Sequence, residues 1–388
     1  MTTIRNKTAI AGIGQTEFSK DSGRSTLRMA LEVILEALAD AGLEPRDIDG
    51  IVRMSANDDV FEIDLLRSLD LPNLRFFAEI PHGGGAACGT IACAAAAITA
   101  GMADVVVTFR SLNERSERRF GLSSLAGGLG GWMQYYLPHG LVTPAQWVAI
   151  FAQRYLYEFG HTTEEFGWVS VLCRKHAATN PHAMMYGRPI TLEEHQASRW
   201  IAEPLRLLDC TLDTDGACAA IVVSAERAKA LRSTPVYIAA AAQGTGSRTE
   251  IMTSYQRTSL VRLEEAEATA RELYRVAEMT PRDIGMAQIY DHFTPFVLMA
   301  LEAYGFAAPG EAPLLLREGR LELDGSMPMN THGGHLGEGY LHGFGHIVEG
   351  VRQLRATAVN QVAGISNCIV TSGTGVPTSG LILSKEAY

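Results

Sequence analysis

Lysine is scarce in this sequence. The 388 residues include only Lys7, Lys20, Lys175, Lys229 and Lys385. Catalysis through an imine between enzyme and substrate requires a lysine in the binding pocket, and none of the five lies in a glycine-rich motif. The sequence therefore argues against Schiff-base chemistry.

Several motifs of other enzyme classes are absent as well. GxSxG and GxxxxGK[ST] do not occur, which excludes a nucleophile-elbow hydrolase and a P-loop enzyme. HExxH is also missing. Four histidines lie close together in the sequence, but no carboxylate accompanies them at ligand spacing, so we predict no metal site: His332, His335, His342 and His346.

The composition lacks a basic excess and a membrane-spanning run. Acidic residues outnumber basic ones by 43 to 33, and no basic stripe with interleaved aromatics is present, so we expect no nucleic-acid partner. No apolar run of transmembrane length is free of charge, and the first residues show no secretory pattern. The six cysteines form no CxxC pair. These features predict a cytoplasmic enzyme with reduced cysteines and no membrane association.

The most distinctive stretch covers residues 330–350, NTHGGHLGEGYLHGFGHIVEG. It contains four histidines and seven glycines. Glycine is poor core material but lets the backbone approach a ligand closely. The run leads into a predicted helix at residues 340–354, whose first N–H groups attract anionic groups. We therefore expect a functional site here.

Two short repeats indicate a duplicated fold. Pro45-Arg46-Asp47-Ile48 recurs 236 positions later as residues 281–284, and His82-Gly83-Gly84 recurs 250 positions later as residues 332–334. Each half is predicted to run strand, helix, strand, glycine-rich turn, buried helix, strand. The helices at 88–100 and 340–354 are apolar nearly all round, which favours helices placed between layers.

The remaining elements follow from hydrophobic periodicity. Residues 7–14 read as a buried strand, and Ser25 or Thr26 then caps a helix that buries Leu27, Leu31, Ile34 and Leu38 and stops at Gly42. We predict helices at 144–159 and 263–278 and strands at 105–109, 213–224 and 369–371.

Residues 113–208 interrupt the repeat. They contain all four tryptophans, at positions 132, 147, 168 and 200, and a glycine patch at 127–131. Insertions of this kind usually cover a site or form an oligomer contact. We therefore divide the chain into an N-terminal half (1–112 and 209–232), an inserted cap region (113–208) and a C-terminal half (233–388).

With these pieces assembled, the chain resembles the thiolase superfamily, in its sterol-carrier-protein-thiolase-like or lipid-transfer-protein branch. The motifs are AIAGIGQTEF, GMADVVV after the alanine-rich helix, EPLRLLDC, TDGACAAIVV and GTGVPTSGLIL. The resemblance implies an α/β thiolase fold, a five-layered αβαβα arrangement of two duplicated halves with an inserted loop domain. It also implies a homodimer that acts on CoA thioesters.

The positions that carry thiolase chemistry are changed. Gly84 stands where the resemblance implies a nucleophilic cysteine, and Cys88 lies about one helical turn further on, as a core residue. Tyr290 and Tyr340 stand at two histidine positions, and Thr371 stands at the second cysteine position. Without a thiolate, acyl transfer through a covalent thioester is disfavoured.

This pattern, with YDHFTPF, NTHGG, GEGYLHG and EGVRQLRATAVN, resembles the thiolase-like aldolases of bacterial steroid side-chain degradation. That resemblance implies retro-aldol cleavage of a steroid β-hydroxyacyl-CoA, such as 17-hydroxy-3-oxo-4-pregnene-20-carboxyl-CoA, to a 17-ketosteroid and propionyl-CoA. It implies a companion too, a zinc-ribbon and OB-fold domain of a hydratase. Zinc is then expected only in that companion, and no cofactor in this chain.

The residues support a non-covalent mechanism. Tyr290 and Tyr340 are predicted to divide the base and acid roles, without an assignment of which is which. His332 or His292, with backbone N–H groups at 373–375, would stabilise the enolate oxygen. Asp291 is expected to orient a neighbouring group. The glycines predicted to contact substrate are Gly84, Gly333, Gly373 and Gly375.

Two alternatives stay open from the sequence. A thiolase of the acetyl-CoA acyltransferase type could use another nucleophile and would form a covalent acyl-enzyme. A non-catalytic lipid or acyl-CoA carrier would not depend on either tyrosine hydroxyl.

Overall fold

The computed structural model describes residues 3–387 apart from 56–59, 118–133, 249–251 and 253–254. Its principal strands form one mixed sheet in the order β3-β2-β4-β7-β1-β8-β11-β10-β9. The two halves meet where β1 pairs with β8 over only two residue pairs. The strands are β1 Thr8–Gln15, β2 Gly50–Met54, β3 Phe76–Ile80, β4 Val105–Asn113, β7 Asp215–Ser224, β8 Val236–Gly244, β9 Ala287–Gln288, β10 Asn367–Thr371 and β11 Thr378–Ser384.

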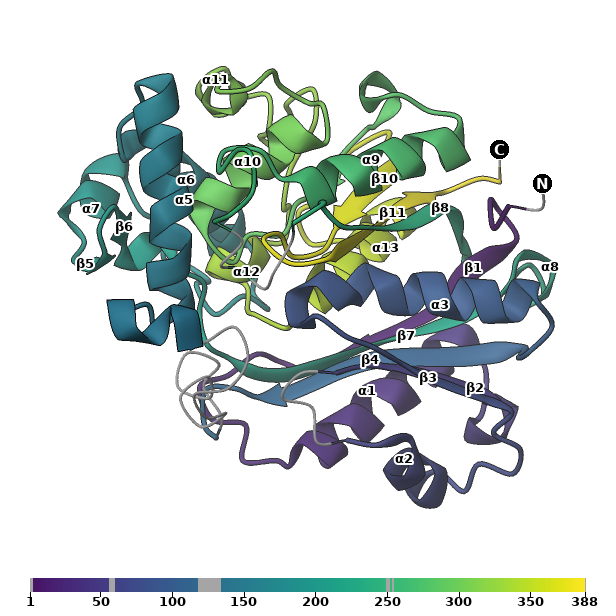
Figure 1. The fold of residues 1–388 in the computed structure, drawn as a ribbon. Coiled ribbons are helices and arrows are strands. Elements are labelled where there is room, and N and C mark those ends of the chain that lie inside the picture. The colour runs from purple at the N-terminus through teal and green to yellow at the C-terminus, as the bar shows by residue number, and fades with distance from the viewer. Residues whose placement is uncertain (1–2, 56–59, 118–133, 249–251, 253–254, 388) are drawn as a thin grey trace.

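The five predicted layers are present, and Figure 1 shows them stacked. Helices α3 (Ala87–Thr99) and α13 (Phe344–Arg355) lie in the middle, and each contacts strands of both halves. Helix α1 (Thr26–Ala41) covers the outer face of the first half, and α9 (Glu264–Ala277) covers the outer face of the second. The alanine-rich α3 is buried on both sides because its small side chains let two sheet layers approach it.

One predicted repeat is confirmed in three dimensions. The two Pro-Arg-Asp segments each form a 3₁₀ turn, η1 (Pro45–Asp47) and η6 (Pro281–Asp283), between an outer helix and a strand. In both turns the aspartate accepts a hydrogen bond from the backbone N–H three residues earlier, at 2.8 and 2.7 Å. The two halves therefore share this local design.

The second predicted repeat was paired wrongly. His82-Gly83 stands directly before the turn into α3, whereas His332-Gly333 lies ten residues ahead of α13. His342-Gly343 is the structural counterpart, since both of its residues have positive φ, 50° and 95°, as do His82 and Gly83, at 80° and 52°. Sequence identity selected the wrong glycine turn.

Two further predictions need correction. The helix predicted at 340–354 begins at Phe344, and Tyr340 lies in the loop between α12 (Gly334–Gly337) and α13. In α1, Leu27 and Leu31 are only half-buried, and the buried face is centred on smaller residues. A Cβ on Gly12 of β1 would meet the Ala37 carbonyl oxygen at 2.0 Å, so close strand–helix packing selects that face.

The inserted region is mostly helical. Its first long helix has the predicted bounds, Pro144–Phe159 (α5), and is followed by α6 (Glu164–Thr179), α7 (Leu192–Ala197) and the β5–β6 hairpin (Trp200–Ala202 and Leu205–Arg206). Trp132 and the 127–131 glycine patch lie outside the described residues. The other elements are α2 Glu62–Ser68, η2 Gly83–Ala86, η4 Leu137–His139, η5 Leu207–Asp209, α8 Ala225–Ala228, α10 Thr294–Ala303 and α11 Ala312–Arg317. Within the described part of the chain, no helix is both long and apolar enough to cross a bilayer.

Candidate active site

A cavity of about 690 Å³ lies where the inserted region meets both halves. Much of its wall is apolar, and both Tyr290 and Tyr340 line it. The inserted region supplies Pro144, Ala145 and Ile201, and the C-terminal half supplies Phe293. A largely apolar cavity of this size, with a few convergent polar groups, is typical of a small-molecule site.

The two tyrosines come together inside this cavity. Tyr290 follows β9, Tyr340 lies in the loop between α12 and α13, and their hydroxyl oxygens are 2.9 Å apart. Their backbones are fixed by two threonine hydroxyls, because Tyr290 N donates to Thr371 Oγ1 and Tyr340 N donates to Thr214 Oγ1, both at 2.9 Å. The pair is therefore preorganised as a hydrogen-bonded unit.

Gly84 is required by this arrangement. A Cβ at Gly84 would lie 2.0 Å from the Tyr290 hydroxyl oxygen, so a cysteine side chain and this tyrosine exclude one another. Cys88, the second residue of α3, is fully buried, its Sγ lies 3.5 Å from the Val370 carbonyl oxygen, and burial raises the pKa of its thiol to about 12. Cys210 does line the cavity, but burial raises the pKa of that thiol as well. Neither cysteine is an activated nucleophile.

The environment raises the pKa of both phenols. Burial is the main cause for Tyr290 and for Tyr340, the charge of Glu114 acts in the same direction, and Arg110 opposes it. The sequence-based mechanism needed these pKa values lowered, so burial works against it. The mutual hydrogen bond separates the two, because it lowers the pKa of Tyr290 and raises that of Tyr340.

Asp291 holds the tyrosine-bearing segments together from behind. Its carboxylate accepts hydrogen bonds from the backbone N–H groups of His335 and Leu336 at 2.9 and 3.2 Å and lies 3.0 Å from His346 Nε2. The side chains of His335 and His346 hold the pKa of the fully buried Asp291 carboxyl well below its usual range, although burial alone would raise it. Asp291 does not line the cavity and fits the predicted orienting role geometrically.

The ring of His335 is in contact with both tyrosines. It meets the Tyr290 and Tyr340 rings edge to face, with centroids 4.6 and 4.9 Å apart. Its Nε2 accepts a hydrogen bond from Gly343 N, so the proton of the neutral ring is on Nδ1, 3.1 Å from Asp291 Oδ1. His335 therefore supports the tyrosine pair mechanically.

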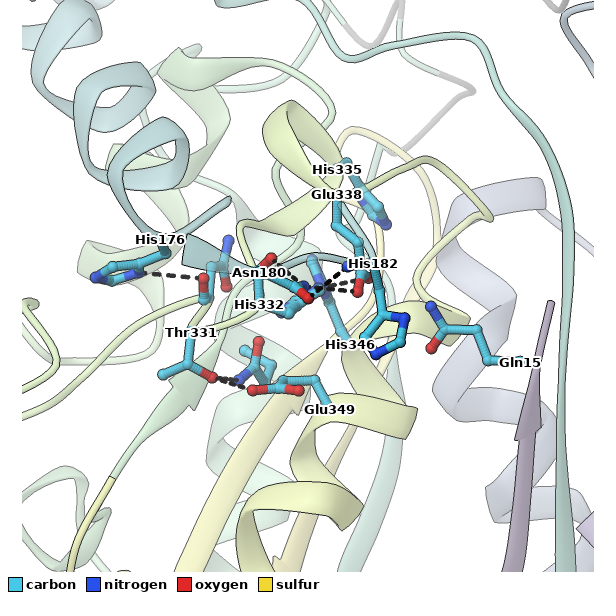
Figure 2. A network of polar contacts seen from close by, with 12 residues as sticks. Gln15, His176, Asn180, His182, Thr331, His332, His335, Glu338, His346 and Glu349 are labelled. Carbon is cyan, nitrogen blue, oxygen red and sulfur yellow. Dashed lines mark hydrogen bonds and ion pairs between the residues drawn. The ribbon is translucent and has the colours of Figure 1, made fainter. Parts of the chain in front are cut away.

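His332 is not in the cavity. Figure 2 shows it in a buried polar network with Asn180 and Glu338. Its Nε2 lies 3.1 Å from His346 Nδ1, and His346 in turn reaches Asp291. The predicted contact between His332 and an enolate is therefore not supported by its position, because its side chain is engaged behind the cavity wall rather than in it.

The predicted glycines divide into two groups. Gly84 and Gly373 line the cavity, whereas Gly333 packs on Ala177 and Gly375 packs near Phe296. Two of the backbone donors predicted at 373–375 already have partners: Gly373 N donates to Gly84 O at 2.7 Å, and Gly375 N donates to Glu265 Oε1 at 2.9 Å. The N–H groups of Gly373 and Gly375 are therefore occupied in this structure, and an enolate contact from the Thr374 N–H stays a prediction.

His292 lines the cavity beside Tyr290, with ring centroids 4.9 Å apart. Burial lowers the pKa of its imidazole to about 3, so the ring is neutral. A neutral imidazole offers one N–H donor and one acceptor.

One group of side chains has the composition of a metal site. Within the described residues, the ligand atoms of Asp291, His335 and His346 lie within 4.8 Å of one another. The carboxylate oxygen is 3.0 to 3.1 Å from each imidazole nitrogen, which is hydrogen-bonding distance. The contact of His346 Nε2 is a hydrogen bond, whereas His335 Nδ1 has no hydrogen-bond partner of suitable geometry among the described residues, and the expectation of no metal in this chain stays a prediction.

Comparison with known proteins places the chain. The thiolase C-terminal domain-like family matches residues 246–385. A steroid side-chain-cleaving aldolase of Thermomonospora curvata is 52% identical over 391 residues, covering 100% of both chains. The 17-hydroxy-3-oxo-4-pregnene-20-carboxyl-CoA lyase of Mycobacterium tuberculosis is 52% identical and covers 98% of this chain and 100% of the relative. The chain belongs to the steroid side-chain-cleaving aldolase family of the thiolase superfamily.

A solved structure supports this membership. The Ltp2-ChsH2(DUF35) aldolase superposes with a TM-score of 0.94 at 52% identity, covering 99% of each chain. The thiolase-like fold and the family predicted from sequence motifs are both confirmed by these likenesses.

Several cavity residues of this aldolase-family chain were missed from sequence. Glu114, His342 and Thr374 line the cavity, and the buried Arg110 donates to His342 Nδ1 at 3.3 Å. The strand β4 was predicted to end at residue 109, but it continues through Arg110 to Asn113, directly before Glu114, and is buried throughout. The available signal in the sequence was that the charged residues Arg110 and Glu114 follow directly on a run that predicts a buried strand.

Proposed function

We propose that this chain is a carbon–carbon lyase that cleaves a steroid β-hydroxyacyl-CoA by retro-aldol chemistry. The relative in Mycobacterium tuberculosis is a 17-hydroxy-3-oxo-4-pregnene-20-carboxyl-CoA lyase, and the same substrate is proposed here. One observation carries the mechanism: two phenol oxygens lie 2.9 Å apart in the cavity, and the Tyr290 hydroxyl fills the space that a cysteine side chain at position 84 would need.

The reaction needs no net proton from solvent. A base removes the proton of the tertiary hydroxyl, the carbon–carbon bond breaks to give the 17-ketone, and the electron pair becomes the enolate of propionyl-CoA. An acid then protonates the enolate carbon. Because the phenols are in direct contact, a proton can pass from the base to the acid and restore the starting state.

As part of this proposal, we assign the base role to Tyr290 and the acid role to Tyr340. The hydrogen bond between them lowers the pKa of Tyr290 and raises that of Tyr340, and Arg110 lowers both. Tyr290 also adjoins Gly84, whose missing side chain leaves its hydroxyl room at the head of α3.

The assembly is part of the proposal. The solved relative is an Ltp2-ChsH2(DUF35) aldolase, in which the aldolase chain stands together with a DUF35 companion. By this likeness, we propose that this chain forms a homodimer that joins the zinc-ribbon and OB-fold domain of a hydratase. Zinc would belong to that companion. The proposed compartment is the cytoplasm.

The test is a coupled assay with tertiary β-hydroxyacyl-CoA esters, run with and without the companion domain. Tyr290→Phe and Tyr340→Phe should each lower kcat by about 10²- to 10⁴-fold, because each removes an acid–base group. Tyr186→Phe is the matched control, because this tyrosine is 56% exposed and lies outside the cavity lining. Circular dichroism checks that every variant is folded.

Two results would contradict the proposal. A covalent acyl-enzyme detected by mass spectrometry would favour the acetyl-CoA acyltransferase-type thiolase. Unchanged ligand binding in both tyrosine variants, with no cleavage by the wild-type complex, would favour a lipid or acyl-CoA carrier.

A further inference from the structure

The two cavity tyrosines are anchored to different halves of the fold. Tyr290 follows β9, and its N–H donates to Thr371 Oγ1 at the end of β10, so the C-terminal half holds it. Tyr340 belongs to the same half by sequence, but its N–H donates to Thr214 Oγ1, which stands directly before β7 of the N-terminal half. The 2.9 Å contact between the two hydroxyls therefore joins side chains that are held from opposite halves.

Thr214 binds the backbone of Tyr340 on both sides. Its hydroxyl accepts a hydrogen bond from Tyr340 N at 2.9 Å and donates one to Tyr340 O at 3.0 Å. One hydroxyl can do both, because it has one O–H donor and two acceptor lone pairs. Tyr340 lies in no helix or strand, and a glycine precedes it. The hydroxyl of Thr214 therefore pairs backbone groups that no regular element pairs here.

Thr214 itself is held firmly in the first half. It is fully buried, and β7, which begins at the next residue, lies between β4 and β1 in the sheet. The carboxylate of Asp215 accepts hydrogen bonds from the Arg115 and Ser116 N–H groups at 2.9 and 3.0 Å. The hydroxyl at position 214 is therefore fixed independently of the loop that it binds.

We infer that Thr214 is a positioning residue for the cleavage reaction: by fixing the Tyr340 backbone from the other half of the fold, it sets the distance between the two phenol oxygens. Thr214 does not line the cavity, so it acts only through Tyr340. This inference rests on the proposed retro-aldol function.

Thr214→Val removes the hydroxyl while the side chain keeps nearly the same shape. The Tyr340 backbone then loses both partners, and a displacement of about 1 Å at a reacting group can cost about 100-fold in rate. In the complex with the companion domain, kcat should fall by about 10- to 100-fold, and KM should change by less than about threefold because the cavity lining is unchanged. Thr214→Ser keeps the hydroxyl and should recover most of kcat.

A double-mutant cycle separates positioning from general stability. In a Tyr340→Phe background no hydroxyl remains to be positioned, so Thr214→Val should lower the residual kcat by less than about twofold. Thr269→Val is the matched control and should keep the wild-type kcat. Thr269 is also fully buried, and its Oγ1 donates to Glu265 O at 2.9 Å, but it lies on α9 of the outer layer.

Circular dichroism checks the folding of each variant. Thr214→Ala replaces the valine variant if valine prevents folding, and Thr214→Ser tests the hydroxyl in either case.

The outcomes can be told apart. If the wild-type complex cleaves substrate and Thr214→Val keeps its kcat, the inference is overturned and the proposed function stands. If Thr214→Val lowers kcat equally with and without the Tyr340 hydroxyl, or if Thr214→Ser loses as much activity as Thr214→Val, the effect does not pass through the hydrogen bonds to Tyr340 and the inference also fails. If wild type does not cleave with its companion, the proposed function itself fails.

Discussion

At the scale of single residues, Gly84 and Tyr290 depend on each other. The phenol oxygen occupies the space that any side chain at position 84 would need. Loss of a thiol at the head of α3 and gain of a phenol after β9 are thus one structural change. A substitution at either position alone creates a clash or a void.

Gly84→Ala should lower kcat by about 100-fold, because the added Cβ displaces the Tyr290 hydroxyl by an ångström or more. Steady-state kinetics of the complex measures this. Gly285→Ala is the control, because its nearest neighbour to a Cβ is at 3.4 Å, an ordinary contact. Activity of Gly84→Ala within threefold of wild type would mean that the turn relaxes freely and that Tyr290 need not stay where it is.

At the scale of elements, one carboxylate joins the segment after β9 to α12 and α13. Asp291 binds the first N–H groups of α12 and the His346 side chain of α13. Tyr340 lies between those two helices, so its position depends on this junction. The chemistry therefore relies on a residue that does not line the cavity.

Asp291→Asn should destabilise the fold by about 3 kcal/mol, because it removes a buried charge whose partners stay in place. Denaturant unfolding measures the change. Activity should fall together with stability as Tyr340 loses its support. Lys20→Asn, at an exposed loop position, serves as a control for the substitution to asparagine. Wild-type stability in Asp291→Asn would show that the junction is held by other contacts.

The buried polar network of His332, Asn180 and Glu338 (Figure 2) is expected to make the stability of the fold depend on pH. Burial raises the pKa of Glu338 to about 8, from 4.5 in an exposed chain. The unfolded chain therefore releases this proton at lower pH than the fold does. The stability that the protonated Glu338 gives the fold is fully present below pH 4.5 and is lost as the pH rises toward 8.

Glu338→Gln should remove this dependence, because an amide stays neutral. The variant should gain stability relative to wild type by about 1 kcal/mol per pH unit between about pH 5 and pH 8. Thermal unfolding across that range measures the difference. If the stabilities of the two proteins change with pH in the same way between pH 5 and pH 8, Glu338 is already charged in the fold.

At the scale of the whole molecule, the nine-stranded sheet ends at β3 on one side. Phe77 of this edge strand is 64% exposed. An exposed edge with a large apolar side chain is a template for pairing with another strand. The edge strand is therefore the expected contact of the proposed homodimer.

Phe77→Lys should convert the dimer to monomers, because it places a charge where apolar area is buried. Light scattering after size-exclusion chromatography measures the mass. Leu314→Lys on α11 is the matched control, since Leu314 is 46% exposed on the opposite outer layer. A dimer that survives Phe77→Lys would place the interface elsewhere.

Periodic segments and the Pro-Arg-Asp repeat predicted the elements and the duplication, because both are local properties of the sequence, and the resemblance of its motifs implied the thiolase fold and the family. The bounds of α5 and the place of α3 between two layers followed directly from their residues, although α3 leaves Ala96 exposed. The motifs also identified Tyr290 and Tyr340 as a pair, although they are fifty residues apart.

Only the tertiary structure decided which groups line the cavity. The sequence does not distinguish His332 from His292. His332 lies in a buried polar network behind the cavity wall, whereas His292 lines the cavity. Backbone donors at Gly373 and Gly375 were taken by Gly84 and Glu265, through contacts that span far-apart segments. Such occupancy depends on packing between segments distant in the chain, and no local pattern of residues records it.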